Sequence, residues 1–272
     1  MSEVPLIEVR NLSVRFGDLQ VLRDVSFSVN RGERFVILGG SGSGKSTLMR
    51  CIVGLQEPTG GTVLIEGEDF TNADRASRLR ILRKFGVLFQ SSGLFASMTL
   101  AENIALPLET YTALDTPEIR SLIDVKLASV GLSGYAGFLP SEISGGMKKR
   151  AGLARAMALD PQILGFDEPS AGLDPVTSAA LDTLIIELNE ILNTTMLVVT
   201  HELDSIFNIA QRVIMLDKST NGIIAEGSPH ELRAHSQDPR VRAFFHRNRS
   251  VDPGDETRGQ AKNQAQEENQ HG

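Results

Sequence analysis

The sequence predicts an α/β domain with a mixed sheet, an antiparallel β subdomain and an inserted α-helical subdomain. Short apolar runs typical of strands alternate with segments of helical spacing, first up to residue 89 and again over residues 163–226. Between these two stretches, residues 91–160 are mostly helical in pattern. The 272 residues are 41% hydrophobic, which is enough for a sizeable packed core.

The first part of the chain reads as strands that lead into a glycine-rich segment. Alternating runs separated by polar turns predict strands at residues 6–10, 12–16 and 25–29. An apolar run at 35–38 predicts a buried strand, and a helix is expected from Lys45 to about Val53. Further strands are expected at residues 62–65 and 85–89, and the basic cluster at 75–84 is interpreted as a solvated helix face.

The second part resumes the alternation after a helix at residues 117–130. We expect a strand at 163–166, a helix at 175–192, a strand at 196–200, a helix at 203–210 and strands at 213–216 and 223–226. Residues 1–246 therefore form the expected domain, with the helical subdomain at about 91–160. From residue 247 the composition turns polar, with Val251 as the one large aliphatic residue after 248, so we expect a disordered tail over 247–272. A tail that becomes ordered on a partner is the alternative.

Composition limits the classes of function. The formal net charge is -7 without a long basic block, so general nucleic-acid binding is not indicated. Cys51 is the only cysteine, which excludes an intrachain disulfide and fits a reducing compartment. We read no signal peptide at the start, and no run approaches the ~20 apolar residues that span a bilayer. The expected location is cytoplasmic, and any work at a membrane would require a partner.

Residues 39–46 match the pattern G-x-x-x-x-G-K-[ST] between a predicted strand and a predicted helix. Glycines let backbone N–H groups converge on phosphate oxygens, and the helix N-terminus adds partial positive charge. Lysine places an ammonium beside the β- and γ-phosphates, and the serine hydroxyl can bind Mg²⁺. The sequence therefore predicts an ATP site built by Gly39, Gly40, Ser41, Gly42, Ser43, Gly44, Lys45 and Ser46, with Thr47 as a further phosphate contact.

Two carboxylates, Asp167 and Glu168, follow the apolar run at residues 163–166. A buried strand would deliver them to the carboxyl edge of the sheet, where open α/β folds bind ligands. Asp167 would hold Mg²⁺ directly or through water, and Glu168 would polarise the attacking water. The alternative is a pair of helix-capping acids before Pro169.

His201 and Gln90 end predicted strands in the same way. His201 could contact the γ-phosphate, and Gln90 could contact Mg²⁺ or the attacking water. A packing histidine and a surface glutamine are the alternatives.

Ser144, Gly145 and Gly146 precede a predicted helix and form a second candidate anion site. One chain rarely needs two such loops for one nucleotide. The economical interpretation is that the second loop closes over ATP bound to another chain, and an ordinary serine N-cap is the alternative.

Together these motifs resemble the ATP-binding subunit of ABC transporters. The phosphate loop corresponds to Walker A, Gln90 to the Q-loop, Ser144-Gly145-Gly146 to the signature, Asp167-Glu168 to Walker B, residues 170–174 to the D-loop and His201 to the H-loop. The resemblance covers roughly residues 5–235. It implies a P-loop NTPase fold of ABC type, ATP and Mg²⁺ as cofactors, and Phe16 as the aromatic that stacks on adenine.

A narrower resemblance is to the Mla (maintenance of lipid asymmetry) phospholipid-transport ATPases. It rests on residues 89–95, 103–108, 139–147, 167–175 and 238–242. Met147 stands where glutamine is commonest in ABC signatures, and methionine there is similar to the Mla group. The resemblance implies a homodimer around two ATP–Mg²⁺, a separate membrane permease and a lipid-carrying subunit, with attachment to the cytoplasmic side of the inner membrane.

Two other interpretations fit the sequence less well, and a third remains open. A soluble ABC-type ATPase of DNA repair or translation would typically carry a long coiled coil, a zinc-bearing insert or two ATPase domains. A P-loop kinase would not explain Ser144-Gly145-Gly146. A transporter of another hydrophobic substrate fits the same ATPase, because nothing in such a sequence contacts the cargo. Residues 94–108 are the expected docking site for the permease, with ordinary subdomain core as the alternative.

Overall fold

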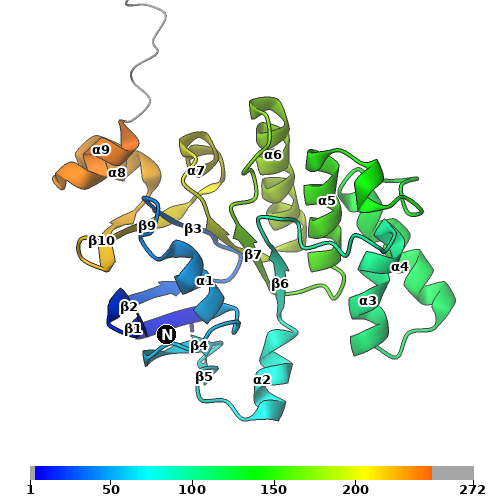
Figure 1. The fold of residues 1–272 in the computed structure, drawn as a ribbon, viewed down its shortest axis with the longest axis horizontal. Coiled ribbons are helices and arrows are strands. Elements are labelled where there is room, and N and C mark those ends of the chain that lie inside the picture. The colour runs from blue at the N-terminus through cyan, green and yellow to red at the C-terminus, as the bar shows by residue number, and fades with distance from the viewer. Residues whose placement is uncertain (1–3, 247–272) are drawn as a thin grey trace, which may run out of the picture.

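A six-stranded sheet organises the chain in the computed structural model, which describes residues 4–246 (Figure 1). Its strands lie in the order β10-β9-β3-β8-β7-β6, and only the edge strand β10 runs antiparallel to its neighbour. The bounds are β3 Arg34–Gly39, β6 Phe85–Leu88, β7 Ile163–Asp167, β8 Thr195–Val199, β9 Arg212–Asp217 and β10 Gly222–Gly227. The carboxyl ends of the five parallel strands therefore meet at one edge, as the sequence predicts.

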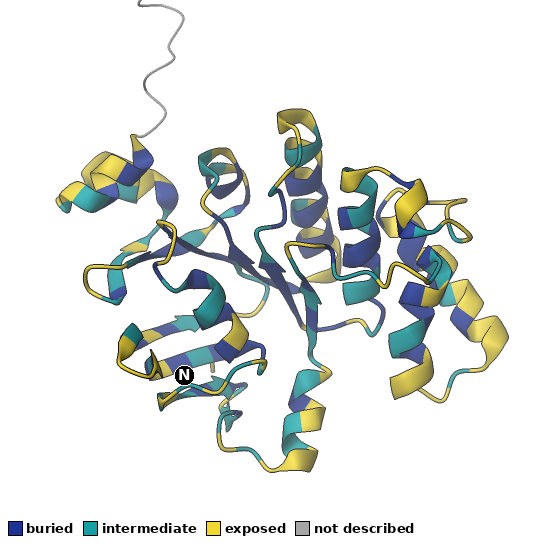
Figure 2. Cartoon of the chain, viewed as in Figure 1, coloured by how far each residue is buried: buried dark blue, intermediate teal, exposed yellow. Residues whose placement is uncertain are grey.

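Each parallel strand of this sheet packs on both faces, because successive side chains point in opposite directions. On β3, Val36 and Leu38 join the core under the helices, while Phe35 and Ile37 join the core shared with the second sheet. Figure 2 shows these strands as the buried interior of the molecule. The unbroken apolar run at residues 35–38 is explained by this burial from both sides.

The second sheet is antiparallel, in the order β2-β1-β4-β5. Its strands are β1 Ile7–Phe16, β2 Leu19–Val29, β4 Gly60–Ile65 and β5 Glu68–Asp69. The two strands expected at 6–10 and 12–16 are one strand, which is irregular at Asn11, a residue with φ of 49°. The strand expected at 25–29 begins earlier, at Leu19, because its first residues pair with the end of β1.

The inserted subdomain consists of α3 Leu100–Tyr111, α4 Thr116–Ser129, the short η1 Pro140–Glu142 and α5 Gly145–Ala156. Capping boxes begin two of these helices, Thr99 with Glu102 and Asp115 with Glu118. Asn103 is fully buried, and its amide bonds the backbone of Phe95, Met98 and Thr99. This side chain fixes the segment that links β6 to the helices.

The remaining helices flank the two sheets. They are α1 Lys45–Ile52, α2 Arg75–Leu82, α6 Pro175–Leu192, α7 Leu203–Ile209, α8 Pro229–His235 and α9 Pro239–Phe245. The basic cluster falls mainly on α2, as expected, where Arg80 pairs with Glu68 and Arg78 lies over the ring of Phe70. None of the helices within residues 4–246 is long and apolar enough to cross a membrane.

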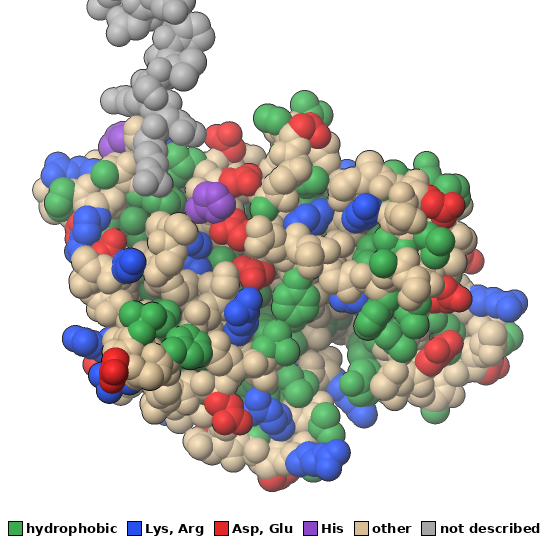
Figure 3. Space-filling model, in the orientation of Figure 1, with side chains coloured by type: hydrophobic (Ala, Val, Ile, Leu, Met, Phe, Trp, Pro, Cys, Tyr) green, Lys and Arg blue, Asp and Glu red, His purple; other side chains and the backbone are tan. Residues whose placement is uncertain are grey.

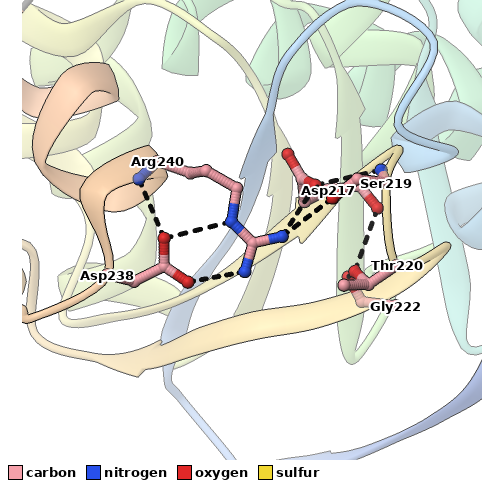
Figure 4. A network of polar contacts seen from close by, with 6 residues as sticks. All are labelled: Asp217, Ser219, Thr220, Gly222, Asp238 and Arg240. Carbon is pink, nitrogen blue, oxygen red and sulfur yellow. Dashed lines mark hydrogen bonds and ion pairs between the residues drawn. The ribbon is translucent and has the colours of Figure 1, made fainter.

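Helices α8 and α9, which the strand and helix patterns did not predict, close the described part of the chain. The Arg240 guanidinium donates to Asp238, to Asp217 at the end of β9 and to Ser219 in the following turn (Figure 4). This hydrogen bonding holds the pKa of Asp238 down to about 2. The network ties α9 to the β9–β10 turn. The tail expected over 247–272 lies outside the described residues.

Candidate active site

The phosphate loop joins β3 to α1 and has the backbone that its glycines permit. Gly39, Gly42 and Gly44 have positive φ values of 147°, 74° and 95°. A Cβ on Gly39 would lie 2.3 Å from the Leu216 carbonyl oxygen, so this position requires glycine for close approach as well. Gly40 and Gly42 face open space, which leaves that part of the loop accessible to a ligand.

Lys45 lies inside the loop and is only 8% exposed. Its Nζ donates to the carbonyl oxygens of Gly39 at 2.9 Å and Gly40 at 3.0 Å. Burial lowers the pKa of Lys45, while the Glu168 and Asp167 carboxylates act in the opposite direction. The ammonium is thus held where its positive charge can act on phosphates bound by the loop.

Ser46 and Asp167 are brought together from α1 and β7. The Ser46 hydroxyl donates to Oδ1 of Asp167 at 3.0 Å. A hydroxyl and a carboxylate oxygen beside a phosphate loop are the hard oxygen ligands that Mg²⁺ prefers. The two residues predicted to bind the ion therefore fit it.

Glu168 and His201 also meet, since β7 and β8 are neighbours in the sheet. Nδ1 of His201 lies 2.8 Å from Oε1 of Glu168. The Glu168 side chain is 12% exposed and that of His201 59%. The second oxygen, Oε2, is buried and has no hydrogen-bond partner in the described part of the chain. The acceptor capacity of this oxygen is therefore unused, and its proposed role toward a bound water stays a prediction.

The Glu168 backbone adopts the left-handed region, with φ of 50°. Such a conformation costs about 1–3 kcal/mol for a residue other than glycine and persists only where its surroundings hold it. The Glu168 N–H donates to the Val199 carbonyl at 2.9 Å, and its carbonyl accepts from the N–H of Ala171. The interpretation of Asp167 and Glu168 as helix-capping acids is not favoured, because Asp174 is the N-cap of the following helix.

Other predicted site residues lie around this centre. Gln90 is exposed just beyond β6, and Phe16 is 52% exposed at the end of β1. Thr47 is half-buried in the first turn of α1, while Ser41 is exposed. Ser43 is buried, and its hydroxyl has no partner among residues 4–246. Their proposed contacts with nucleotide stay predictions.

The serine–glycine loop (residues 144–146) lies away from the phosphate loop. Ser144 is the N-cap of α5, and its hydroxyl accepts from the Met147 N–H at 3.3 Å. Figure 1 shows α5 well separated from α1, with β6 and β7 between them. The Ser144 cap is thus present as the alternative interpretation expected. Ser144 and Gly145 are also exposed, which leaves them accessible to another chain, while Gly146 is half-buried.

A groove of about 620 Å³ opens between the central sheet and the helical subdomain. In Figure 3 hydrophobic side chains surround a hollow on this face, between α2 and α3. The lining includes Leu55, Leu79, Phe95, Leu106 and Tyr111. Within residues 94–108, Phe95 and Leu106 line the groove, while Leu100, Ile104 and Leu108 are buried in the subdomain core. Docking of a permease at this segment stays a prediction.

Comparison with known proteins decides the family. A model described as "ABC transporter" matches residues 22–171. The chain belongs to the ABC transporter family. The match confirms the resemblance, and with it the expected fold and the ATPase class. The roles of individual residues within this ABC ATPase stay predictions.

Two curated relatives of this ABC chain have different printed functions. The intermembrane phospholipid transport system ATP-binding protein MlaF of Escherichia coli K12 is 41% identical over 241 residues, which cover 88% of each chain. The "Probable ribonucleotide transport ATP-binding protein mkl" of Mycobacterium tuberculosis H37Rv is also 41% identical, over 239 residues. This chain spans only 66% of the mycobacterial protein's length.

Solved ABC structures share the fold. The dimeric ATP-binding cassette MJ0796, bound to ADP and Pi in a post-hydrolysis state, superposes with a TM-score of 0.74 at 31% identity. That match covers 82% of this chain and 98% of the cassette. cbiO1 of Clostridium perfringens, part of the ABC transporter complex cbiONQ, gives 0.78 at 26% identity, with 91% and 96% covered.

Proposed function

We propose that this ABC ATPase powers phospholipid transport between bacterial membranes through a separate permease. The observation that supports this most directly is the 41% identity to the Escherichia coli phospholipid transport ATPase over 88% of both chains. The mycobacterial relatives share the identity but extend well beyond this chain, so their printed substrate carries less weight. A partner permease places the chain on the cytoplasmic side of the inner membrane.

The chemistry assigned to the site is attack of water on the γ-phosphate of ATP. Lys45 and the loop amides bind the phosphates, and Phe16 stacks on adenine. Ser46 and Asp167, together with Gln90, hold Mg²⁺, which supplies positive charge against the phosphates when bound. Glu168 accepts the proton of the attacking water through its free oxygen, and His201 orients the carboxylate and contacts the γ-phosphate.

Two copies of the chain complete two such sites. Both loops are intact in one sequence but separated in one chain, so each serine–glycine loop closes over ATP bound to its partner. The dimeric state of the MJ0796 cassette supports this arrangement. The phosphates of each ATP then contact Lys45 of one chain and Ser144 of the other. Hydrolysis removes this bridge and lets the two chains separate.

The groove is the proposed contact with the permease. One wall comes from the central sheet and the helices beside it, and the other comes from the helical subdomain. A helix seated in the groove would therefore respond to movement of one wall relative to the other. Leu79→Asp on α2 should abolish co-purification of the integral subunit from membranes while ATP binding is retained, because a charge would be buried in the interface. Val125→Asp, an exposed apolar position on α4 outside the groove, is the matched control.

The same preparation tests the cargo. Lipid mass spectrometry of the intact complex should find phospholipid enriched over the detergent-solubilised membrane. A complex that carries no lipid would reject phospholipid transport. Recovery of the wild-type ATPase without any integral protein would instead favour the soluble class of ABC ATPases.

A further inference from the structure

One buried cation in the helical subdomain has no role in the site described so far. Lys149 lies on α5, five residues after Ser144, and is only 5% exposed. Its Nζ donates to the Gln90 carbonyl at 2.6 Å and to the Glu168 carbonyl at 3.3 Å. A single ammonium therefore joins three segments: the helix of the serine–glycine loop, the segment that follows β6, and the end of β7.

The two acceptors of Lys149 are neutral carbonyl groups, so the charge has no direct ion-pair partner in this contact. Burial lowers the pKa of Lys149, and the Glu168, Asp167 and Glu202 carboxylates act against that effect. Keeping a charge in such a place is costly unless its hydrogen bonds are worth the desolvation. A lysine needed only to fill space could be replaced by an apolar chain of the same length.

One acceptor of Lys149, the Glu168 carbonyl, belongs to a residue with an unusual backbone conformation. Glu168 is the left-handed residue described above, and its carbonyl otherwise accepts only a 3.2 Å bond from Ala171 among residues 4–246. Lys149 adds a charged donor on the same oxygen. At 3.3 Å this bond is longer than the bond of about 2.7–2.9 Å typical of a charged nitrogen donor, so the 2.6 Å bond to the Gln90 carbonyl anchors the ammonium and the Glu168 carbonyl is its second acceptor. The ammonium therefore helps to hold the peptide that aims the Glu168 carboxylate.

The same face of α5 holds the segment after β6 at two more points. A Cβ on Gly152 would lie 2.6 Å from the Ser92 carbonyl oxygen, so glycine permits the close approach of this segment. Arg155 donates to the Gly93 carbonyl and lies over the ring of Phe95, which lines the groove. Lys149, Gly152 and Arg155 are spaced by three residues and thus share one side of the helix. The groove, α5 and Glu168 are joined through this side.

We infer that Lys149 is a positioning residue for hydrolysis, which holds the Gln90 and Glu168 peptides in register with the helix that carries the serine–glycine loop. The inference rests on the proposed role of Glu168 as the group that activates water. Lys149 touches no reacting atom. It acts through the orientation of two residues that would flank the attacking water, and through their link to the loop that closes over the partner's ATP.

The test compares Lys149→Met with Lys149→Arg in the full chain. Methionine keeps an unbranched apolar stem and removes both hydrogen bonds, whereas arginine keeps the positive charge and has enough N–H donors for both carbonyls. We expect kcat for ATP hydrolysis to fall at least tenfold in Lys149→Met, with KM for ATP changed less than threefold and ATP-dependent dimerisation retained. Lys149→Arg should recover a substantial part of kcat. If the methionine chain does not fold, Lys149→Leu, which also lacks a donor, takes its place with the same readouts.

Lys126→Met is the matched control, since Lys126 is a buried lysine of the same subdomain that pairs with Asp160 instead. It should lower the melting temperature without lowering kcat. A kcat for Lys149→Met within twofold of wild type would overturn the inference. So would losses of kcat, nucleotide affinity and dimerisation that run in parallel with thermal stability, as a merely structural lysine would give. Glu168→Gln is measured alongside to distinguish failure of the Lys149 inference from failure of the proposed function. Full turnover in Glu168→Gln would reject the role of Glu168 itself.

Discussion

Nδ1 of His201 lies 2.8 Å from Oε1 of Glu168, and this contact leaves the other carboxylate oxygen buried and without a partner in the described residues. The two residues follow the carboxyl ends of the neighbouring parallel strands β7 and β8, so the sheet itself brings them together. A carboxylate with one oxygen bound to an imidazole and one oxygen free is suited to take a proton from water. A substitution can remove the proton-accepting carboxylate of Glu168 and keep the shape of the side chain.

Glu168→Gln makes that change. We expect steady-state ATP hydrolysis to fall by about 10²–10⁴-fold, the usual contribution of a positioned general base. ATP binding and ATP-dependent dimerisation should persist, because Lys45 and the loop amides are unchanged. Phosphate release measured beside nucleotide binding checks both expectations. Glu190→Gln, at an exposed position on α6, should hydrolyse ATP at the wild-type rate. Unchanged turnover in Glu168→Gln would reject the assigned role.

Composite sites can be tested by mixing two defective chains. Lys45→Ala removes the phosphate-binding cation, and Ser144→Arg blocks the loop that closes over the partner's ATP. In a mixed dimer one site combines both lesions, and the other regains both intact halves. The mixture should therefore recover ATP-dependent dimerisation and hydrolysis that neither variant shows alone. Sedimentation and phosphate release measure the two properties, and no recovery at any mixing ratio would count against the shared site.

The phosphate loop could be predicted from the sequence because its determinants are local. A buried strand, positive-φ glycines and a helix with lysine in its first turn follow one another within residues 34–52, and the structure places them so. Asp167, Glu168 and His201 were also accessible to prediction, since each follows an apolar run that ends a parallel strand. Neighbouring parallel strands necessarily bring such residues to one edge of the sheet.

Lys149 and Asn103 could not be found in the same way. Both occupy helices, where a lysine or an asparagine usually reads as a solvated position, and both are buried only because other segments fold over them. Their acceptors are backbone carbonyls, which leave no mark in the side-chain pattern.

The early start of β2 could not be predicted either. Asp24, with φ of 49°, interrupts the alternation of apolar and polar residues that would indicate the strand.

The packing of α5 on the sheet depends on a small residue in β6. A Cβ on Gly86 would lie 2.0 Å from the carbonyl oxygen of Ala156, a backbone atom that cannot swing away. Gly86→Ala should therefore force α5 and β6 apart and reduce the free energy of unfolding by about 1–3 kcal/mol. Thermal and denaturant unfolding measure the loss. Gly137→Ala introduces the same methyl where nothing lies within 4 Å and should leave stability nearly unchanged. Equal stability of the two variants would contradict the close packing.

Asp182 gives the stability a dependence on pH. This carboxylate on α6 is 2% exposed and accepts a hydrogen bond from the Ser205 hydroxyl at 3.1 Å. Burial raises the pKa of Asp182, and the nearby Glu202 and Asp204 act in the same direction, while hydrogen bonds from Ser205 and Asn208 oppose them. The folded chain thus retains a proton at pH values where the unfolded chain has released it.

The sign of the effect follows from that difference. Above the ordinary aspartate pKa of about 3.9, the folded state binds more protons at Asp182, so this residue's contribution to stability falls as pH rises. The loss is complete above the raised pKa. Asp182→Asn still accepts the bond from Ser205 and removes the titration. Its melting temperature relative to wild type should therefore increase between pH 4 and pH 7.5.

The control is Asp124→Asn, a substitution at an exposed position on α4. It removes the same formal charge and should show no such trend. If the melting temperatures of Asp182→Asn and wild type differ by the same amount at both pH values, the folded and unfolded chains bind protons equally at Asp182, and the raised pKa is wrong.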